Sequence, residues 1–140
     1  MSLQGLKQYQ STSTQSGTFD ASPHRLIQML MEGALEKIAM AKGFMMRDEV
    51  EKKGHHISWA IKIIGGLQNS LNKDAGGELA QNLDNLYDYM CEKLFEANIE
   101  NSVEKLDEVS NLMVTVKEGW DGIENEVKQS TQPQVRSQSA

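Results

Sequence analysis

Apolar residues recur every three or four positions in four long stretches of this chain, which is the spacing of one face of an α-helix. The third stretch, residues 76–99, opens with a Gly-Gly pair and then contains no further Gly or Pro. Tyr89 lies about 100° from its apolar stripe, because each helical residue turns by about 100°. We expect a helix with one core-facing side and a spare aromatic residue. The stripe consists of Leu79, Leu83, Leu86, Tyr87, Met90, Leu94 and Ala97.

The first and fourth stretches have recognisable starts. Ser22 is a suitable N-cap and Pro23 suits the first helical position, so the first helix is predicted to run from there to the connection at Arg47-Asp48. The fourth helix begins after Asn101 or Ser102, since either side chain is able to cap it. The two stripes are Ile27, Leu30, Met31, Ala34, Leu35, Ile38, Ala41 and Met45, then Leu106, Val109, Met113, Val116, Trp120 and Ile123.

The second stretch is predicted to begin at Asp48, whose side chain caps the helix while Glu51 reaches back to form a capping box. It runs to about Asn72, before the strong turn signal at residues 72–77. Trp59 and Ile63 fall outside its stripe and widen the apolar arc beyond what one packed face requires. The stripe itself is Val50, Ile57, Ala60, Ile61, Ile64, Leu67 and Leu71.

Short connections between long helices favour an antiparallel arrangement. We therefore predict an all-α fold, an antiparallel up-down four-helix bundle over residues 22–128. Residues 1–21 are rich in Ser, Thr, Gln and Gly and are expected to form a flexible leader. Residues 129–140 are expected to form a disordered tail.

Charge and composition exclude several classes of protein. A net charge of −6 argues against nucleic-acid binding, which usually requires a basic face. Cys91 is the only cysteine, so no internal disulfide forms. No apolar run approaches the roughly 20 residues that cross a bilayer, which argues against stable membrane insertion. The N-terminus lacks a signal-peptide pattern, so we expect a cytoplasmic protein.

The sequence contains no catalytic or cofactor motif. A di-iron bundle needs Glu-x-x-His pairs, and none of the three histidines has Glu three residues before it, so we expect no metal and no cofactor. Asp84, Asp88 and Glu92 form an acidic row that we interpret as a solvated face. Cys91 has no basic neighbour in sequence and is expected to be a half-buried thiol. We do not expect an enzyme.

A histidine phosphotransfer bundle is the alternative function, because such a domain is helical and exposes one reactive imidazole. His55 or His56 would take that role. These domains usually carry a Lys-Gly pair after the histidine, whereas here Lys53-Gly54 precedes it. Solvated surface histidines are the simpler interpretation.

Surplus apolar side chains outside the stripes indicate a partner-binding groove, since exposed apolar patches on a bundle typically accept another helix. Leu6 and Tyr9 add two such apolar side chains on the leader. The candidate groove residues are Trp59, Ile63, Leu67, Tyr89 and Leu112.

Several segments, in order and spacing, strongly resemble the flagellar secretion chaperone family FliS. They are Ala21–Ala34 (ASPHRLIQMLMEGA), Gly76–Leu83, Leu86–Met90 and Glu96–Ile99, together with Tyr9-Gln10 and Trp120. The family usually has tyrosine at the position of Met31 and often acidic residues at His24 and Arg25. We expect these departures to affect only the surface of the first helix.

This resemblance implies a cytoplasmic helical bundle that binds the C-terminal segment of flagellin, prevents premature polymerisation and delivers flagellin to the flagellar type III export apparatus. It also implies that the flagellin segment wraps around the bundle. By the same resemblance, Tyr9, with Leu6 beside it, would contact the flagellar export gate. Flagellar regulators are a further class of candidate partner.

Overall fold

The computed structural model describes the backbone of residues 21–130 and the side chains of residues 21–123. The expected leader contacts Leu6 and Tyr9 and most of the expected tail lie outside this range. Four helices follow one another: α2 (Pro23–Met46), α3 (Val50–Asn69), α4 (Lys73–Glu100) and α5 (Val103–Ser130). The described part of the chain contains no strand, so the predicted all-α class is confirmed.

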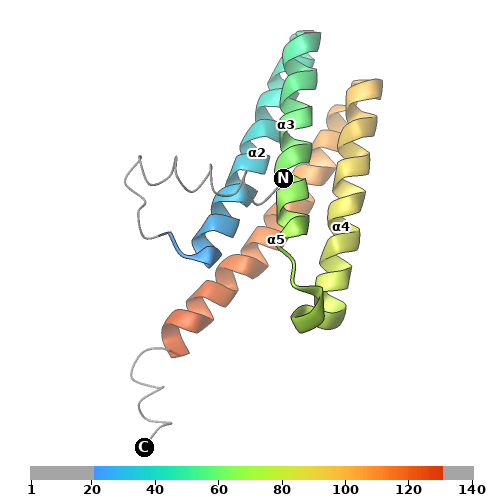
Figure 1. The fold of residues 1–140 in the computed structure, drawn as a ribbon. Coiled ribbons are helices and arrows are strands. Elements are labelled where there is room, and N and C mark those ends of the chain that lie inside the picture. The colour runs from blue at the N-terminus through green and yellow to red at the C-terminus, as the bar shows by residue number, and fades with distance from the viewer. Residues whose placement is uncertain (1–20, 131–140) are drawn as a thin grey trace, which may run out of the picture.

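The helices form a ring in which sequence neighbours run in opposite directions (Figure 1). α2 packs against α3 and α5, and α4 packs against the same two helices. The α2/α3 edge and the α4/α5 edge therefore lie on opposite sides of the bundle. The C-terminal end of α5 extends beyond the other helices (Figure 1). The predicted antiparallel four-helix bundle is confirmed.

The core lies where the predicted stripes of all four helices meet. Burying this apolar surface is the main contribution to stability, because each fully buried Leu, Ile or Met contributes about 1.5–3 kcal/mol. Met31 is in the core, so the expectation that its departure from the family pattern affects only a helix surface is wrong. The most deeply buried large side chains are Leu30, Met31, Ile38, Ile57, Ile64, Leu67, Met90, Leu94, Leu106, Val109 and Met113.

The predicted cap at the start of α2 is confirmed, whereas the one predicted for α3 is wrong. The Arg25 amide donates to Ser22 Oγ at 3.1 Å, and Pro23 occupies the first turn. Asp48 instead has a φ of 58° and its amide donates to the Met45 carbonyl, so it completes the turn that ends α2. Aspartate tolerates this left-handed conformation better than most residues. α3 then starts at Val50 with no side-chain cap.

The α3–α4 connection contains a short helical turn that the sequence pattern did not predict. α3 ends at Asn69, earlier than expected, and the Asn72 side chain accepts from the Ala75 amide at 3.1 Å. The helical conformation is interrupted at Gly77, whose φ is 55° and ψ is −129°. The regular part of α4 begins after this break, close to the predicted start.

Asn101 and Ser102, the two residues predicted as alternative N-caps of α5, have different roles in the α4–α5 turn. Asn101 adopts the left-handed conformation that ends α4, with φ of 51°. Ser102 caps α5, because its hydroxyl accepts from the Lys105 amide at 3.2 Å.

Three predicted stripe residues are exposed: Val50, Leu79 and Ile123, of which Ile123 is 42% exposed towards the C-terminal end of α5. Val50 and Leu79 are each 65% exposed, and Ala80 is buried beside the position where Leu79 was expected. Val50 is the first residue of α3, and Leu79 follows the Gly77 break. Few neighbouring side chains are available to cover a residue in the first turn of a helical segment, so the amphipathic pattern overestimates burial there.

Candidate partner-binding surface

Ile63 and Leu67, two of the five candidate groove residues on the helices, lie in the core. Ile63 is 4% exposed and Leu67 is 1% exposed. The placement of Ile63 outside the packed face of α3 is therefore wrong, because α3 buries a wider arc than its stripe predicted. In the described part of the chain, these two side chains pack inside the bundle and are not accessible to a partner.

Trp59 lies on the α2/α3 edge and is the most exposed of the candidate residues, at 44%. The Lys37 ammonium from α2 lies 3.9 Å from the centroid of its ring, a cation–π contact that joins the two helices. His55 and His56 flank it, with ring centroids 5.8 Å and 6.0 Å from the indole. A hollow of about 310 Å³ adjoins the indole and is lined by His55, Ser58, Trp59 and Lys62.

Tyr89 lies on the α4/α5 edge and is 38% exposed, as its position off the stripe predicted. Its hydroxyl donates to Glu108 of α5, and the Lys93 ammonium lies 5.3 Å from its ring centroid. The hydrogen bond to Glu108 raises the pKa of Tyr89 above its ordinary value. The aromatic ring is thus held in place by α5 while one side remains in solvent.

Leu112 is half-buried on α5 and packs against the core. It follows Glu108 by one helical turn, so the two residues share the flank of α5 that faces α4. Ion pairs hold the same edge together: Lys105 contacts Glu96 at 2.8 Å and Glu100 at 2.9 Å. Tyr89 and Leu112 therefore belong to one edge of the bundle.

Trp59 and Tyr89 do not line one groove. Trp59 contacts α2 through Lys37, whereas Tyr89 contacts α5 through Glu108. Because these two edges are on opposite sides of the ring of helices, the expectation of a single groove bordered by both residues is wrong. A partner that touches both aromatic side chains must pass around the bundle.

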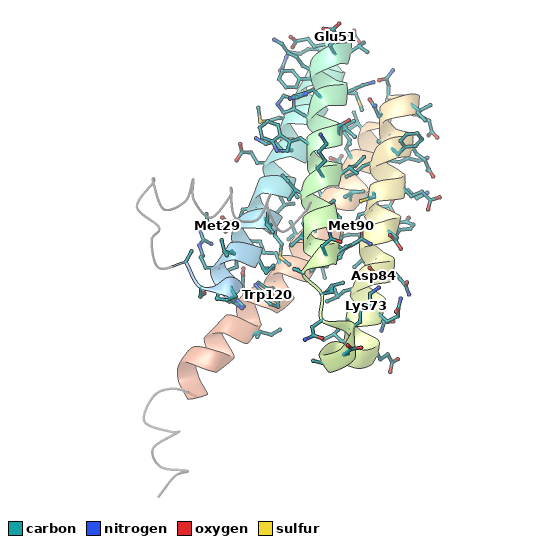
Figure 2. The ribbon with its side chains drawn as sticks, viewed as in Figure 1. Met29, Glu51, Lys73, Asp84, Met90 and Trp120 are labelled. Atoms are coloured by element: carbon teal, nitrogen blue, oxygen red, sulfur yellow. The ribbon has the colours of Figure 1, made fainter. Side chains whose placement is uncertain are left out.

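The α2/α5 edge contains a contact that the sequence analysis missed. The rings of His24 and Trp120 stack with centroids 4.4 Å apart, and Trp120 Nε1 donates to the His24 carbonyl at 3.0 Å. Gln28 donates to Asp121 Oδ1 at 2.6 Å one turn along. Figure 2 shows Trp120 at the end of the bundle where α2 begins. His24 thus connects the first turn of α2 to α5. The sequence pattern did not predict this contact because the two residues are far apart in the chain.

Lys53 is a buried lysine that the sequence analysis did not single out. It is 4% exposed, and its ammonium donates to the Asn98 carbonyl at 2.9 Å and to Asn101 Oδ1 at 2.6 Å. The cation lies at the carboxyl end of α4, where the helix dipole favours positive charge. A lysine in the polar sequence Glu-Lys-Lys-Gly gives no signal for burial, because lysine is almost never fully buried.

The histidines and the acidic row are surface features for the most part. His55 is exposed, and His56 Nδ1 lies 2.8 Å from the Lys52 carbonyl. Asp88 and Glu92 are exposed as expected. Asp84 is instead half-buried: it pairs with Lys73 at 3.0 Å, and Gln68 of α3 donates to its carboxylate at 3.2 Å. Figure 2 shows Asp84 and Lys73 at the same end of α4.

Cys91 is half-buried between α4 and α3, as predicted. Its Sγ lies 4.0 Å from the Ile61 carbonyl. Burial, together with the nearby Asp88 carboxylate, raises the pKa of the thiol to about 11. The protonated form dominates at neutral pH, so this thiol is a poor nucleophile.

Neither a metal site nor a membrane span is found in the described residues. No three His, Cys, Asp or Glu side chains there come together in a way that would hold an ion. None of the described helices combines the length and apolar character needed to cross a bilayer.

Comparison with known proteins identifies the family. The family described as "Flagellar protein FliS" matches residues 5–127. This chain belongs to the FliS family. The "Flagellar secretion chaperone FliSB" of Pseudomonas aeruginosa is 53% identical over 121 residues, which cover 86% of this chain and 96% of the relative. The resemblance noted in the sequence is confirmed.

More distant relatives also match along most of their length. The flagellar secretion chaperone FliS of Salmonella typhimurium is 41% identical over 117 residues, covering 83% of this chain and 87% of the relative. That of Bacillus subtilis is 32% identical over 106 residues, covering 76% and 78%. FliS family membership favours the chaperone interpretation over a phosphotransfer bundle.

Proposed function

We propose that this FliS-family protein is a cytoplasmic export chaperone that binds the C-terminal segment of flagellin, prevents its premature polymerisation and delivers it to the flagellar type III secretion apparatus. The observation that carries the proposal is the 53% identity to a flagellar secretion chaperone over 96% of that relative's length. It acts by binding and not by catalysis.

The described surface supports binding by wrapping. Trp59 on one edge and Tyr89 with Leu112 on the opposite edge supply separate anchors, and aromatic residues commonly dominate binding energy. A segment that is disordered when free is able to follow such a path, because it folds onto the surface as it binds. Its apolar residues are then unavailable for packing between flagellin subunits, which accounts for the block on polymerisation.

We propose different roles for the five candidate residues on the helices. Trp59, Tyr89 and Leu112 contact the flagellin segment directly, whereas Ile63 and Leu67 maintain the core beneath the α2/α3 edge. Leu6 and Tyr9, which lie outside the described residues, are assigned to contact with the export gate. Flagellar regulators are further candidates for these surfaces.

The test measures calorimetric affinity of the full-length chain for a peptide of the cognate flagellin C-terminal segment. We expect Trp59→Ala and Tyr89→Ala each to weaken binding by about 30-fold, which corresponds to roughly 2 kcal/mol for an interface anchor. Circular dichroism should show unchanged helicity, because both side chains are at the surface. Phe95→Ala, at a residue that is 61% exposed on α4, is the matched control and should bind like the wild type.

Two outcomes would contradict the proposal. If the wild-type chain does not co-elute with flagellin or bind the peptide, the chaperone function is wrong. If the peptide binds but neither aromatic substitution changes its affinity, the assigned surface is wrong. Ile63→Asp does not test the surface: placing a charge in the core should unfold the bundle, with a loss of helicity.

A further inference from the structure

The hollow beside Trp59 combines an aromatic wall with positive charge. The positive charge is that of Lys62, which lines the hollow together with Trp59, Ser58 and His55. Lys37 lies over the same ring from α2, and Lys52 is on the same helix two turns before Trp59. Glutamates pair with Lys37 and Lys52, so the uncompensated positive charge at this edge is that of Lys62, in a chain whose net charge is −6.

Lys62 differs from the other lysines near it. Lys37 pairs with Glu36 at 3.4 Å and Lys52 pairs with Glu49 at 3.4 Å. Lys62 has no ion pair or hydrogen bond with any residue in the described part of the chain. On its own helix, Glu51 is eleven residues away, about 16 Å along the axis at 1.5 Å per residue. Its ammonium is therefore available to a carboxylate from outside.

The Trp59 ring is already held in position before a partner arrives. Lys37 covers it at 3.9 Å, and the rings of His55 and His56 contact it from α3. Met40, on the same flank of α2 as Lys37, is 39% exposed and extends the apolar surface. An immobilised aromatic anchor costs little conformational entropy on binding. The surface fits a side chain that is apolar and lies next to a negative charge.

We infer that this hollow accepts an acidic stretch of the flagellin segment, in which an apolar side chain packs on Trp59 and a neighbouring carboxylate pairs with Lys62. The inference rests on the proposed function and adds the chemistry of one contact. Charge complementarity sets the register of the segment on the α2/α3 edge, because an apolar contact alone allows the segment to slide.

The experiment compares charge reversals on two edges of the full-length chain. Lys62→Glu and Lys73→Glu change the net charge equally, but Lys73 lies at the start of α4, where it pairs with Asp84. Binding of the cognate flagellin C-terminal peptide is measured by calorimetry. We expect Lys62→Glu to weaken binding by about tenfold at about 0.1 M salt and by less than about twofold at about 1 M salt, where charges are screened. Lys73→Glu should bind within about twofold of the wild type.

A second peptide, with its Asp and Glu residues changed to Asn and Gln, gives an independent measurement. It should bind the wild type about tenfold more weakly, and Lys62→Glu should no longer distinguish the two peptides. Equal affinity of wild type and Lys62→Glu for the acidic peptide would overturn the inference while leaving the chaperone function intact. Absence of peptide binding by the wild type would instead overturn both.

Discussion

At the scale of single residues, Lys53 shows how a charged side chain is tolerated inside this bundle. Its ammonium donates hydrogen bonds to the Asn98 carbonyl and the Asn101 side chain, which take the place of the water molecules that would solvate an exposed lysine. Asn101 itself has the left-handed conformation that ends α4. One lysine of α3 therefore holds the turn between α4 and α5 in place.

Replacing Lys53 by methionine should destabilise the protein. The Lys53→Met side chain keeps most of the apolar stem but removes the two hydrogen bonds that the charged ammonium donates to Asn98 and Asn101, at a cost of about 2 kcal/mol. Lys52→Met is the matched control: it removes a surface pair with Glu49, worth at most about 1 kcal/mol, and a contact of the ammonium with the Phe44 ring at 5.7 Å. Urea unfolding measures both. Equal losses of unfolding free energy in the two variants would show that the Lys53 hydrogen bonds contribute no more than a surface ion pair.

At the scale of elements, glycine has opposite effects in α4 and α5. Gly77 has a φ of 55° and interrupts α4, whereas Gly119 lies within the continuous helix α5 and is exposed. A Cβ added at either position meets no atom within 4 Å. Differences between substitutions at these sites therefore report backbone conformation and not steric contact.

Alanine at these two positions should shift stability in opposite directions. Gly77→Ala forces an L-residue into a strained conformation and should cost about 1–3 kcal/mol. Gly119→Ala removes the entropy penalty of glycine in a helix and should stabilise by about 0.5–1 kcal/mol. Thermal unfolding followed by circular dichroism gives both values. A stabilising Gly77→Ala would mean that α4 runs straight through residue 77.

At the scale of the whole molecule, the buried titratable groups make the bundle sensitive to alkaline pH. Burial raises the pKa of Tyr87 to about 12 and that of Cys91 to about 11, from ordinary values of 10.0 and 9.0. Hydrogen bonds to Glu96 also raise the pKa of Lys93 and of Lys105. In every case the native state holds its proton more tightly than the unfolded chain.

The free energy of unfolding should therefore fall as pH rises above about 9, and the Tyr87 contribution should be lost between about 10 and 12. Tyr87→Phe keeps the ring and removes the ionisable hydroxyl, so its loss of stability over that interval should be smaller by about 1–3 kcal/mol. Urea unfolding at a series of pH values checks this. Parallel pH profiles for the two proteins would contradict a buried, titrating Tyr87.

Local patterns predicted the elements of this FliS-family protein well. The spacing of Leu30, Ile64, Met90 and Met113 identified four helices, because burying one face per helix imposes a period near 3.6. The Ser22 cap was also predicted, since capping depends only on neighbouring residues. The family resemblance came from the order and spacing of short segments and needed no structure.

Which side chains are free to bind depends on how the four helices pack. Ile63 is buried and Trp59 is exposed, although both were placed outside the α3 stripe. Trp59 lies where α3 meets α2 and Tyr89 lies where α4 meets α5, and these two edges of the ring share no helix. The amphipathic pattern defines one apolar face of each helix. How wide the buried part of each helix is, and which helix lies beside each of its edges, depend on how the four helices pack. For that reason the sequence by itself was enough to predict the bundle and its family, whereas the exposed surface of the bundle follows from the packing of the four helices.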